Sequence, residues 1–206
     1  MNCIETKTRI LDVAEELFAD NGFERVSIRD ITEKAKVNLA AVNYHFGTKD
    51  ELIAAVFERR IGPVNHARLE ALSALEKSTG GRRVKVEEIL EAVIRPTLTG
   101  CAKEGRHLTT FTRLMGRCLV ETTHGLEELL KRQFDPLIRR MDALLLKALP
   151  HLSRAEIFWR RKFTFGVLHH WLLTRDRFVP ADAGKVDTET QIQMLIAFVT
   201  AGFRTA

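Results

Sequence analysis

The sequence predicts an all-helical protein, and three observations point to this fold class. Apolar residues recur at helical spacing along the chain, as in the stripe formed by Ile10, Ala14 and Phe18. Several such segments begin with a capping pair such as Ser27 and Asp30, in which a hydroxyl residue is followed three positions later by an acid. No hairpin dipeptide lies between alternating apolar runs, so we expect no strands.

Composition restricts the class of protein further. A chain of 206 residues suffices for one large or two small domains, and a hydrophobic content of 45% is enough for a core. The longest uncharged stretches, 190–203 and 163–174, are too short to span a bilayer comfortably, and no apolar run precedes the first amphipathic helix. We therefore expect a cytoplasmic protein without a signal peptide and without a membrane partner.

The sequence contains no set of residues typical of an enzyme or a metal site. Cys3, Cys101 and Cys118 are far apart and form no CxxC pair, which argues against a disulfide framework and against zinc. No histidine is followed by another at i+3 or i+4, and the motifs of serine hydrolases, zinc peptidases and phosphate-binding loops are missing. We expect no catalytic residues, no cofactor and no bound metal.

The segment at about 27–46 has the layout of a helix-turn-helix. Ser27 is a favourable N-cap for a first helix whose apolar face contains Ile31 and Ala35. Asn38 then caps a second, very short helix that ends near His45, and a third helix follows. In a helix-turn-helix, the second helix enters the DNA major groove with its N-terminal residues at the bases.

The side chains of this second helix suit contact with DNA. Ala40 and Ala41 are small and allow the helix to lie deep in a groove about 12 Å wide. Asn43 can read a base edge, and Tyr44 or His45 can reach a phosphate. Any small three-helix subdomain with well-capped helices would give a similar pattern, so the pattern alone leaves a purely structural role open.

Residues 4–60 resemble the N-terminal domain of the TetR family of transcriptional regulators. The matching features are Ala14, Leu17 and Phe18 in the first helix, Gly22-Phe23, Ser27-x-Arg29-x-Ile31, Tyr44-x-Phe46 and Lys49-x-x-Leu52. Asn43 departs from this pattern, because most members carry an aromatic residue there. The run 38–47 is similar to the PsrA branch of the family, whose members respond to fatty acids.

The resemblance implies that the chain binds double-stranded operator DNA. Ser27 and Lys49 are then expected to position phosphates, while the first residues of the second helix face the groove. The full set of expected DNA-binding residues is Ser27, Arg29, Asn38, Leu39, Ala41, Asn43, Tyr44, His45 and Lys49.

Charge alone gives little support for DNA binding. The chain has a net charge of +5 and a pI near 9.3. Residues 1–60 contain nine Lys and Arg against eleven Asp and Glu, which gives −2 and leaves +7 for the remainder. The positive charge of the N-terminal part is local, from Arg25 to Lys49, and the basic surplus lies in the rest of the chain.

Two domains are expected, with a DNA-binding helix-turn-helix domain at 1–60 and an effector-binding and dimerisation domain at 61–206. Gly62-Pro63 interrupts the helical pattern between them, and a proline there should kink or break the helix. Pro136 is expected to bend a long helix that ends at Pro150.

The last two predicted helices, roughly 154–175 and 188–204, are apolar nearly all round. Such helices are buried on more than one side. A central position within their own domain would explain this pattern. The TetR resemblance instead implies a four-helix bundle with a twin subunit, and therefore a homodimer.

An effector pocket has weaker support. Met and Phe stripes on the central helices are usually core, but Arg113 lies within an otherwise apolar run, where a charge needs an anionic partner. That partner is either a structural Asp or Glu or the carboxylate of a ligand. The candidate ligand-binding residues are Phe111, Arg113, Met115, Phe134, Phe163 and Trp171. The PsrA resemblance and the basic surplus suit a long-chain fatty acid or its coenzyme A ester.

The sequence therefore predicts a ligand-responsive, sequence-specific DNA-binding transcriptional regulator, and the resemblance favours a repressor. Two other classes stay open. One is a protein that coats DNA without sequence preference. The other is a helical acyl- or lipid-binding module without specific DNA binding.

Overall fold

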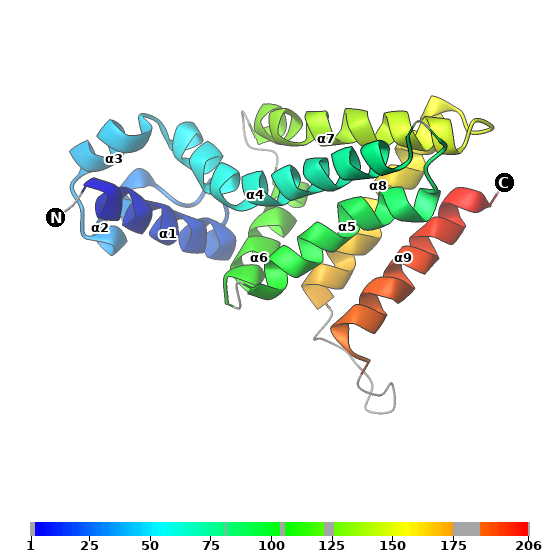
Figure 1. The fold of residues 1–206 in the computed structure, drawn as a ribbon. Coiled ribbons are helices and arrows are strands. Elements are labelled where there is room, and N and C mark those ends of the chain that lie inside the picture. The colour runs from blue at the N-terminus through cyan, green and yellow to red at the C-terminus, as the bar shows by residue number, and fades with distance from the viewer. Residues whose placement is uncertain (1–2, 81, 104–105, 122–125, 175–185, 206) are drawn as a thin grey trace. The chain divides into compact units, whose positions relative to one another are not determined.

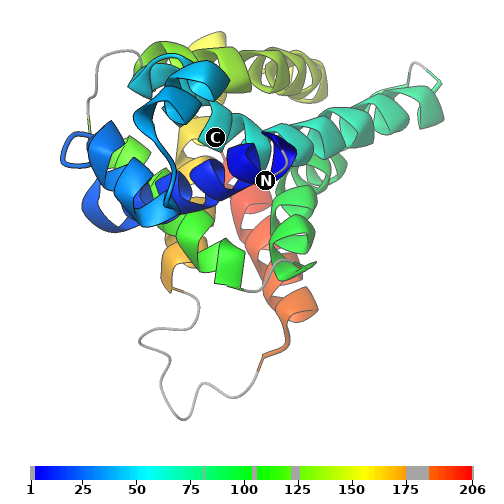
Figure 2. The same ribbon diagram turned by 90° about the vertical axis from the view of Figure 1, so that its left-hand side faces the viewer.

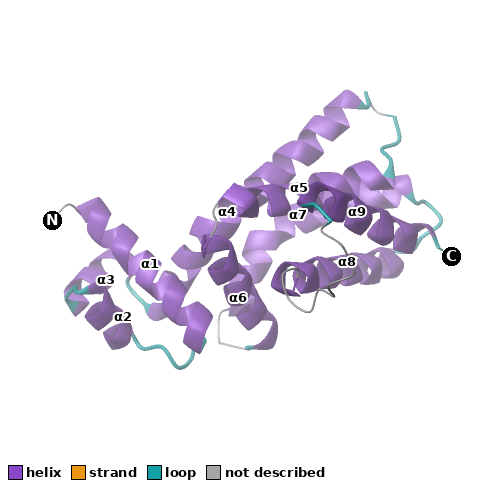
Figure 3. Cartoon of the chain, turned by 90° about the horizontal axis from the view of Figure 1, so that it is seen from below, coloured by secondary structure: helices purple, strands orange, loops and turns teal. Residues whose placement is uncertain are grey.

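The protein is built from helices, as a computed structural model shows in Figure 1. The structure describes residues 3–80, 82–103, 106–121, 126–174 and 186–205, with side chains except at 100–103, 106–109, 111, 119 and 120. The helices are α1 (Cys3–Asn21), α2 (Ile28–Ala35), α3 (Leu39–Phe46), α4 (Lys49–Ser78), α5 (Val86–Lys103), α6 (Arg106–Val120), α7 (Leu126–Ala148), α8 (Arg154–Thr174) and α9 (Thr188–Arg204). Strands are absent from the described ranges (Figure 3), which confirms the predicted all-α fold class.

The chain divides into two compact units. The first unit combines Met1–Pro63 with Gly105–Gln133, and the second unit combines Val64–Glu104 with Phe134–Ala206. Helix α6 and the start of α7 up to Gln133 therefore fold with the N-terminal helices, whereas Val64–Glu104 and the chain from Phe134 onward belong to the second unit. The domain boundary predicted at residue 60 places α6 in the C-terminal domain instead.

An aromatic cluster forms the centre of the first unit, whose helices α1 to α3 face the viewer in Figure 2. Phe18, Phe23 and Phe57 are fully buried, and the ring centroids lie 5.5 Å apart for Phe18 and Phe23 and 5.9 Å apart for Phe23 and Phe57. Val26 and Ile31 are also buried, so the start of α2 is held against the same core. The predicted stripe of α1, formed by Ile10, Ala14 and Phe18, is confirmed.

Helix α4 continues through Pro63, so a helix break, one of the two outcomes expected at this residue, is wrong. Proline removes one intrahelical hydrogen bond, but most helix stability in proteins comes from tertiary packing. Ile61 before the proline and Asn65 and Arg68 after it are buried, and this packing maintains the helix on both sides. Pro136 likewise lies inside α7.

The core of the second unit is formed by α5, α7, α8 and α9, with Leu90, Ile94, Leu145 and Ile196 buried at its centre. Helices α5 and α9 lie side by side, and Arg95 on α5 forms an ion pair with Glu189 on α9 at 2.8 Å. No helix in the described ranges is both long and apolar enough to cross a bilayer.

Candidate nucleic-acid interface

Helix α2 begins with the predicted capping box. The Ser27 hydroxyl donates to Asp30 Oδ2 at 2.7 Å and accepts from the Asp30 N–H at 3.2 Å, and the Ser27 N–H donates to the same carboxylate at 2.7 Å. The Ser27 hydroxyl, followed by its N–H and the charge of Lys49, holds the pKa of Asp30 below its ordinary value. Ser27 is exposed at the start of α2, and its contact with phosphate stays a prediction.

A short turn joins α2 to α3. Lys36 has a φ of +51°, in the left-handed region, and its N–H donates to the Glu33 carbonyl oxygen at 3.2 Å. The Val37 N–H donates to the Thr32 carbonyl oxygen at 3.0 Å, which completes the end of α2. Asn38 then caps α3 as predicted. The two helices are therefore joined in the tight manner of a helix-turn-helix.

Asn38 fixes the start of α3 through its side chain, whose Oδ1 accepts from the Ala41 N–H at 2.8 Å. Val42 and Phe46 on α3 are buried in the first unit. On the other face, the exposed fraction is 55% for Leu39 and 80% for Tyr44. Helix α3 is thus anchored by one face and presents the other to solvent.

The C-terminal turn of α3 carries two neighbouring rings. Tyr44 and His45 meet edge to face with ring centroids 5.2 Å apart. Nε2 of His45 lies 4.0 Å from Sγ of the exposed Cys3 at the start of α1.

Burial raises the pKa of the other described thiol, Cys118, above its ordinary value, so that side chain behaves as part of the core.

The basic residues near this motif differ in their surroundings. Arg29 is exposed on α2, whereas Lys34 forms an ion pair with Glu16 at 3.1 Å. Nζ of Lys49, at the start of α4, lies 3.4 Å from the Glu24 carbonyl oxygen, to which it donates. The structure brings the predicted DNA-binding set together on one unit, and none of its members is buried: Ser27, Arg29, Asn38, Leu39, Ala41, Asn43, Tyr44, His45 and Lys49.

The predicted effector residues are distributed over both units. Arg113 and Met115 belong to the first unit, where Met115 is buried. Phe134 and Trp171 belong to the second unit and pack against its core while partly exposed. Phe163, also in the second unit, is 63% exposed. The side chain of Phe111 lies outside the described part of the structure.

Arg113 has an acidic partner within the protein. Its guanidinium forms an ion pair and hydrogen bond with the Asp20 carboxylate at the end of α1. Of the two partners considered for this charge, a structural acid is therefore the one present. No signal in the sequence indicated which acid it would be, because the two residues are distant in the chain.

A buried cation that the sequence did not single out lies in the second unit. Arg68 donates to the Val93 carbonyl oxygen at 3.0 Å, to Asn65 Oδ1 at 2.9 Å and to the Thr97 hydroxyl. Its charge, after burial as the larger cause, lowers the pKa of His169 below its ordinary value. The sequence signal that could have indicated this buried cation is the position of Arg68 on α4, where a polar residue stands at the spacing of core residues.

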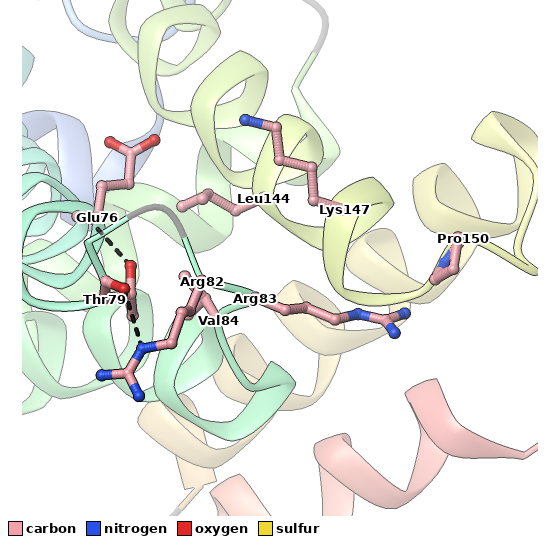
Figure 4. A pocket seen from close by; sticks show the side chains of 8 residues that line it. All are labelled: Glu76, Thr79, Arg82, Arg83, Val84, Leu144, Lys147 and Pro150. Carbon is pink, nitrogen blue, oxygen red and sulfur yellow. Dashed lines mark hydrogen bonds between the residues drawn. The ribbon is translucent and has the colours of Figure 1, made fainter.

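The second unit also has an open pocket of about 450 Å³, drawn in Figure 4. It is lined by Glu76, Thr79, Arg82, Arg83, Val84, Leu144, Lys147 and Pro150. The side chains of Arg82, Arg83 and Lys147 point in different directions, so they do not converge on one position. None of the predicted effector residues lines this pocket.

These features define a helix-turn-helix protein with a larger helical second part. A family model described as "Bacterial regulatory proteins, tetR family" matches residues 10–56, and one described as "Tetracyclin repressor-like, C-terminal domain" matches residues 91–202. The second model alone covers more than half of the chain. The chain therefore belongs to the TetR family of bacterial transcriptional regulators.

Relatives with similar sequences carry regulator names. The chain is 48% identical over 54 residues to the HTH-type transcriptional repressor Rv3405c of Mycobacterium tuberculosis, which covers 26% of this chain and 29% of that protein. It is 27% identical over 117 residues to the HTH-type transcriptional regulator UidR of Escherichia coli, with 50% and 60% covered. It is 25% identical over 183 residues to AcrR of Shigella flexneri, with 84% and 81% covered. The chain thus spans less than a third of the mycobacterial relative.

Two solved structures share the fold. The fatty acid degradation regulator FadR from Bacillus halodurans superposes with a TM-score of 0.64 at 15% identity, covering 98% of this chain and 97% of that one. The SmeT–triclosan complex gives a TM-score of 0.65 at 21% identity, with 96% and 90% covered. At these identities the similarity concerns the fold alone.

Proposed function

We propose that the protein is a homodimeric, effector-responsive repressor that reads a palindromic operator with α3. The observation that carries this proposal is the division of α3 into an anchored face with Val42 and Phe46 and a free face with Leu39, Asn43 and Tyr44. Exposed apolar and aromatic side chains on a rigidly capped short helix suit insertion into a major groove. Ser27 and Lys49 position phosphates, and Asn43 reads a base edge.

A second copy of the chain is the partner of α8 and α9. Trp159 and Phe163 on α8 are spaced by one helical turn and are 50% and 63% exposed. Met194 and Phe198 on α9 have the same spacing and are 61% and 67% exposed. Neighbouring exposed apolar side chains of this size mark an association surface. A two-fold dimer supplies the two recognition helices that a palindrome requires.

Helices α8 and α9 are antiparallel neighbours, and the start of α8 lies beside the end of α9. Arg160, near the start of α8, donates to the Phe203 carbonyl oxygen at 2.8 Å and to the Thr205 carbonyl oxygen at 2.7 Å at the end of α9. A β-carbon on Gly202 would meet no atom within 4 Å, so a partner helix has room to approach there.

The effector is an acyl ligand, either a long-chain fatty acid or its coenzyme A ester. The similarity of residues 38–47 to the PsrA branch supports this assignment, together with the basic surplus of +7 beyond residue 60. Phe134 and Trp171, half-buried at the core of the second unit, are the members of the predicted ligand set best placed to border an apolar ligand. Binding favours a conformer whose recognition helices are wrongly spaced for successive major grooves.

Selection of bound DNA from a random pool, with and without oleate and oleoyl-coenzyme A, tests the proposal. We expect a palindromic motif that either acyl compound releases. If a palindrome is selected but neither compound releases it, the proposed regulator stands and the proposed acyl effector is wrong. Equal recovery of all sequences would favour a DNA-coating protein, and no recovery with retained acyl binding would favour an acyl-binding module.

A further inference from the structure

The open pocket of the second unit has an apolar floor. Val84, which precedes α5, and Leu144 on α7 are buried residues that line it. The end of α4 and the connection from α4 to α5 form one side of the pocket, and the end of α7 forms the other. All of its lining residues belong to the second unit, so the pocket is complete within that unit.

Three exposed cations line the same pocket, and we call them the basic rim: Arg82, Arg83 and Lys147. Nε of Arg82 lies 3.4 Å from the Thr79 carbonyl oxygen, to which it donates. None of the three cations forms an ion pair with another residue in the described part of the chain. Their charges are therefore available to an anionic ligand.

One acid lines the pocket, and its charge is already balanced. Oε2 of Glu76 accepts from Arg140, whose Nε lies 2.9 Å away and whose Nη2 also donates to it. Arg140 is not among the lining residues. Oε1 of Glu76 accepts no hydrogen bond from the described residues, so the pocket combines its basic rim with one acceptor.

The geometry of the basic rim restricts the kind of anion. The three side chains point in different directions, as Figure 4 shows, so a single carboxylate or phosphate cannot contact all of them. A molecule with anionic groups at separate positions can do so. The volume of about 450 Å³ lies in the usual range for small-molecule sites, which favours a small molecule over a segment of a macromolecule.

The lining therefore sets three requirements for a ligand, which are several anionic groups, an apolar face for Val84 and Leu144, and a donor for Glu76. A fatty acid has one anionic group, and an inorganic oligophosphate has no apolar face. A nucleotide has a flat base, hydroxyl or amino donors and several charged phosphate oxygens, which are the groups that arginine binds best. We propose that this pocket is a binding site for a nucleotide that carries two or more phosphate groups.

Isothermal titration calorimetry of the full chain with ATP and with adenosine 3′,5′-bisphosphate tests this site. The two probes separate phosphates that form one chain from phosphates on two sides of the sugar. At about 0.15 M salt, where weak surface attraction is screened, we expect one of them to bind at one site per chain. Adenosine and pyrophosphate should each bind about tenfold more weakly or worse, because each meets only part of the requirements.

Matched variants locate the binding. Arg83→Ala and Lys147→Ala should each weaken nucleotide binding about fivefold or more, since each removes a charged partner of a phosphate. Arg139→Ala removes the same charge from α7 at a side chain that is 81% exposed and does not line the pocket, so it should leave the affinity unchanged. All three positions are exposed, and melting curves without nucleotide confirm that the variants fold.

Three outcomes would overturn the site. They are no binding of either nucleotide, pyrophosphate binding as tight as that of the nucleotides, and losses in Arg83→Ala and Lys147→Ala no larger than in Arg139→Ala. The titrations contain no DNA and no acyl compound. A failure here therefore leaves the proposed regulator untouched, and a failed operator selection leaves the nucleotide site untouched.

Discussion

A β-carbon at Gly22 would overlap Oε1 of Glu121, although the two residues lie on segments far apart in the chain. Gly22 follows α1 with a φ of +88°, where side chains other than glycine are strained. A side chain at position 22 would therefore displace the carboxylate that binds the Phe23 N–H. Gly22 meets two requirements at once, the left-handed helix end and the approach of the Glu121 carboxylate.

Gly22→Ala is expected to destabilise the protein by about 2 to 4 kcal/mol, since the cost of positive φ adds to the displacement of Glu121. Urea unfolding measures this difference. Gly80→Ala is the matched control, because Gly80 has a φ of +55° but no atom within 4 Å of its added carbon. The double variant Gly22→Ala with Glu121→Ala should show less than additive loss. Equal losses for Gly22→Ala and Gly80→Ala would contradict the steric account.

The ion pair between Arg95 and Glu189 predicts a pH dependence of stability. Arg95 donates to both carboxylate oxygens of Glu189, at 2.8 and 2.9 Å, and these bonds, followed by one from Gln193, lower the pKa of Glu189 from 4.5 to about 2. Because the folded pKa lies below the unfolded value, this carboxylate stabilises the folded state above pH 4.5, and its contribution is lost as the pH falls toward 2.

Glu189→Gln is therefore expected to lower the urea midpoint at pH 6 and to approach the wild-type midpoint near pH 3. The pair is exposed, so the difference at pH 6 should be small and should shrink in 1 M salt. Glu128→Gln, at an exposed position on α7, controls for the general effect of removing an acid. A difference between Glu189→Gln and wild type that is constant from pH 3 to pH 6 would speak against the pair.

Local chemistry made the starts of α2, α4 and α8 predictable. The capping boxes Ser27–Asp30, Thr48–Glu51 and Ser153–Glu156 are all formed, with hydroxyl-to-carboxylate distances of 2.7 to 2.9 Å. Each box joins residues three positions apart, so its partners are visible in the sequence before anything is known of the fold. The start of α3 followed from a similar local signal, the N-cap residue Asn38.

Features that depend on contacts between residues far apart in the chain could not be predicted from the sequence. In the sequence, Pro63 indicates a kink or break, because the free-energy cost of a proline arises within its own helix. The packing of Ile61 and Arg68, which keeps α4 continuous, depends on tertiary contacts that the sequence does not show. The sequence indicates that Arg113 needs an anionic partner but does not identify it, and it gives no signal for Arg117. The partners of both residues lie at the end of α1, which no periodicity in α6 indicates.

The predicted dimer surface can be tested at one residue. Phe198→Glu places a charge on the exposed stripe of α9 without entering the core, so the variant is expected to fold and to sediment as a monomer. Its operator affinity should fall at least about a hundredfold, because a single half-site supplies only part of the binding free energy. Ala143→Glu, which adds the same charge at an exposed position on α7, should remain dimeric. A dimeric Phe198→Glu would exclude this stripe.

Tyr44→Ala is expected to weaken binding to the operator and to random DNA by the same factor, about threefold to tenfold, since a phosphate contact carries no sequence information. Titration of both DNAs by fluorescence anisotropy gives the two factors. Tyr44→Phe keeps the ring beside His45 and removes only the hydroxyl, so it separates the polar contact from packing. A loss confined to the operator would make Tyr44 a base-reading residue.

Asn43→Ala is expected to weaken binding to the operator and to leave binding to random DNA unchanged. Asn43 is exposed on α3, between the buried Val42 and the exposed Tyr44, so its truncation leaves the anchored face untouched. An amide that pairs with a base edge is worth about 1 to 3 kcal/mol of discrimination, and operator binding should weaken by about tenfold or more while random-DNA binding stays the same. The same anisotropy titrations measure both. An unchanged ratio of operator to random binding would mean that Asn43 does not read the sequence, and base recognition would then rest on Asn38, Leu39 and Ala41 at the start of the helix.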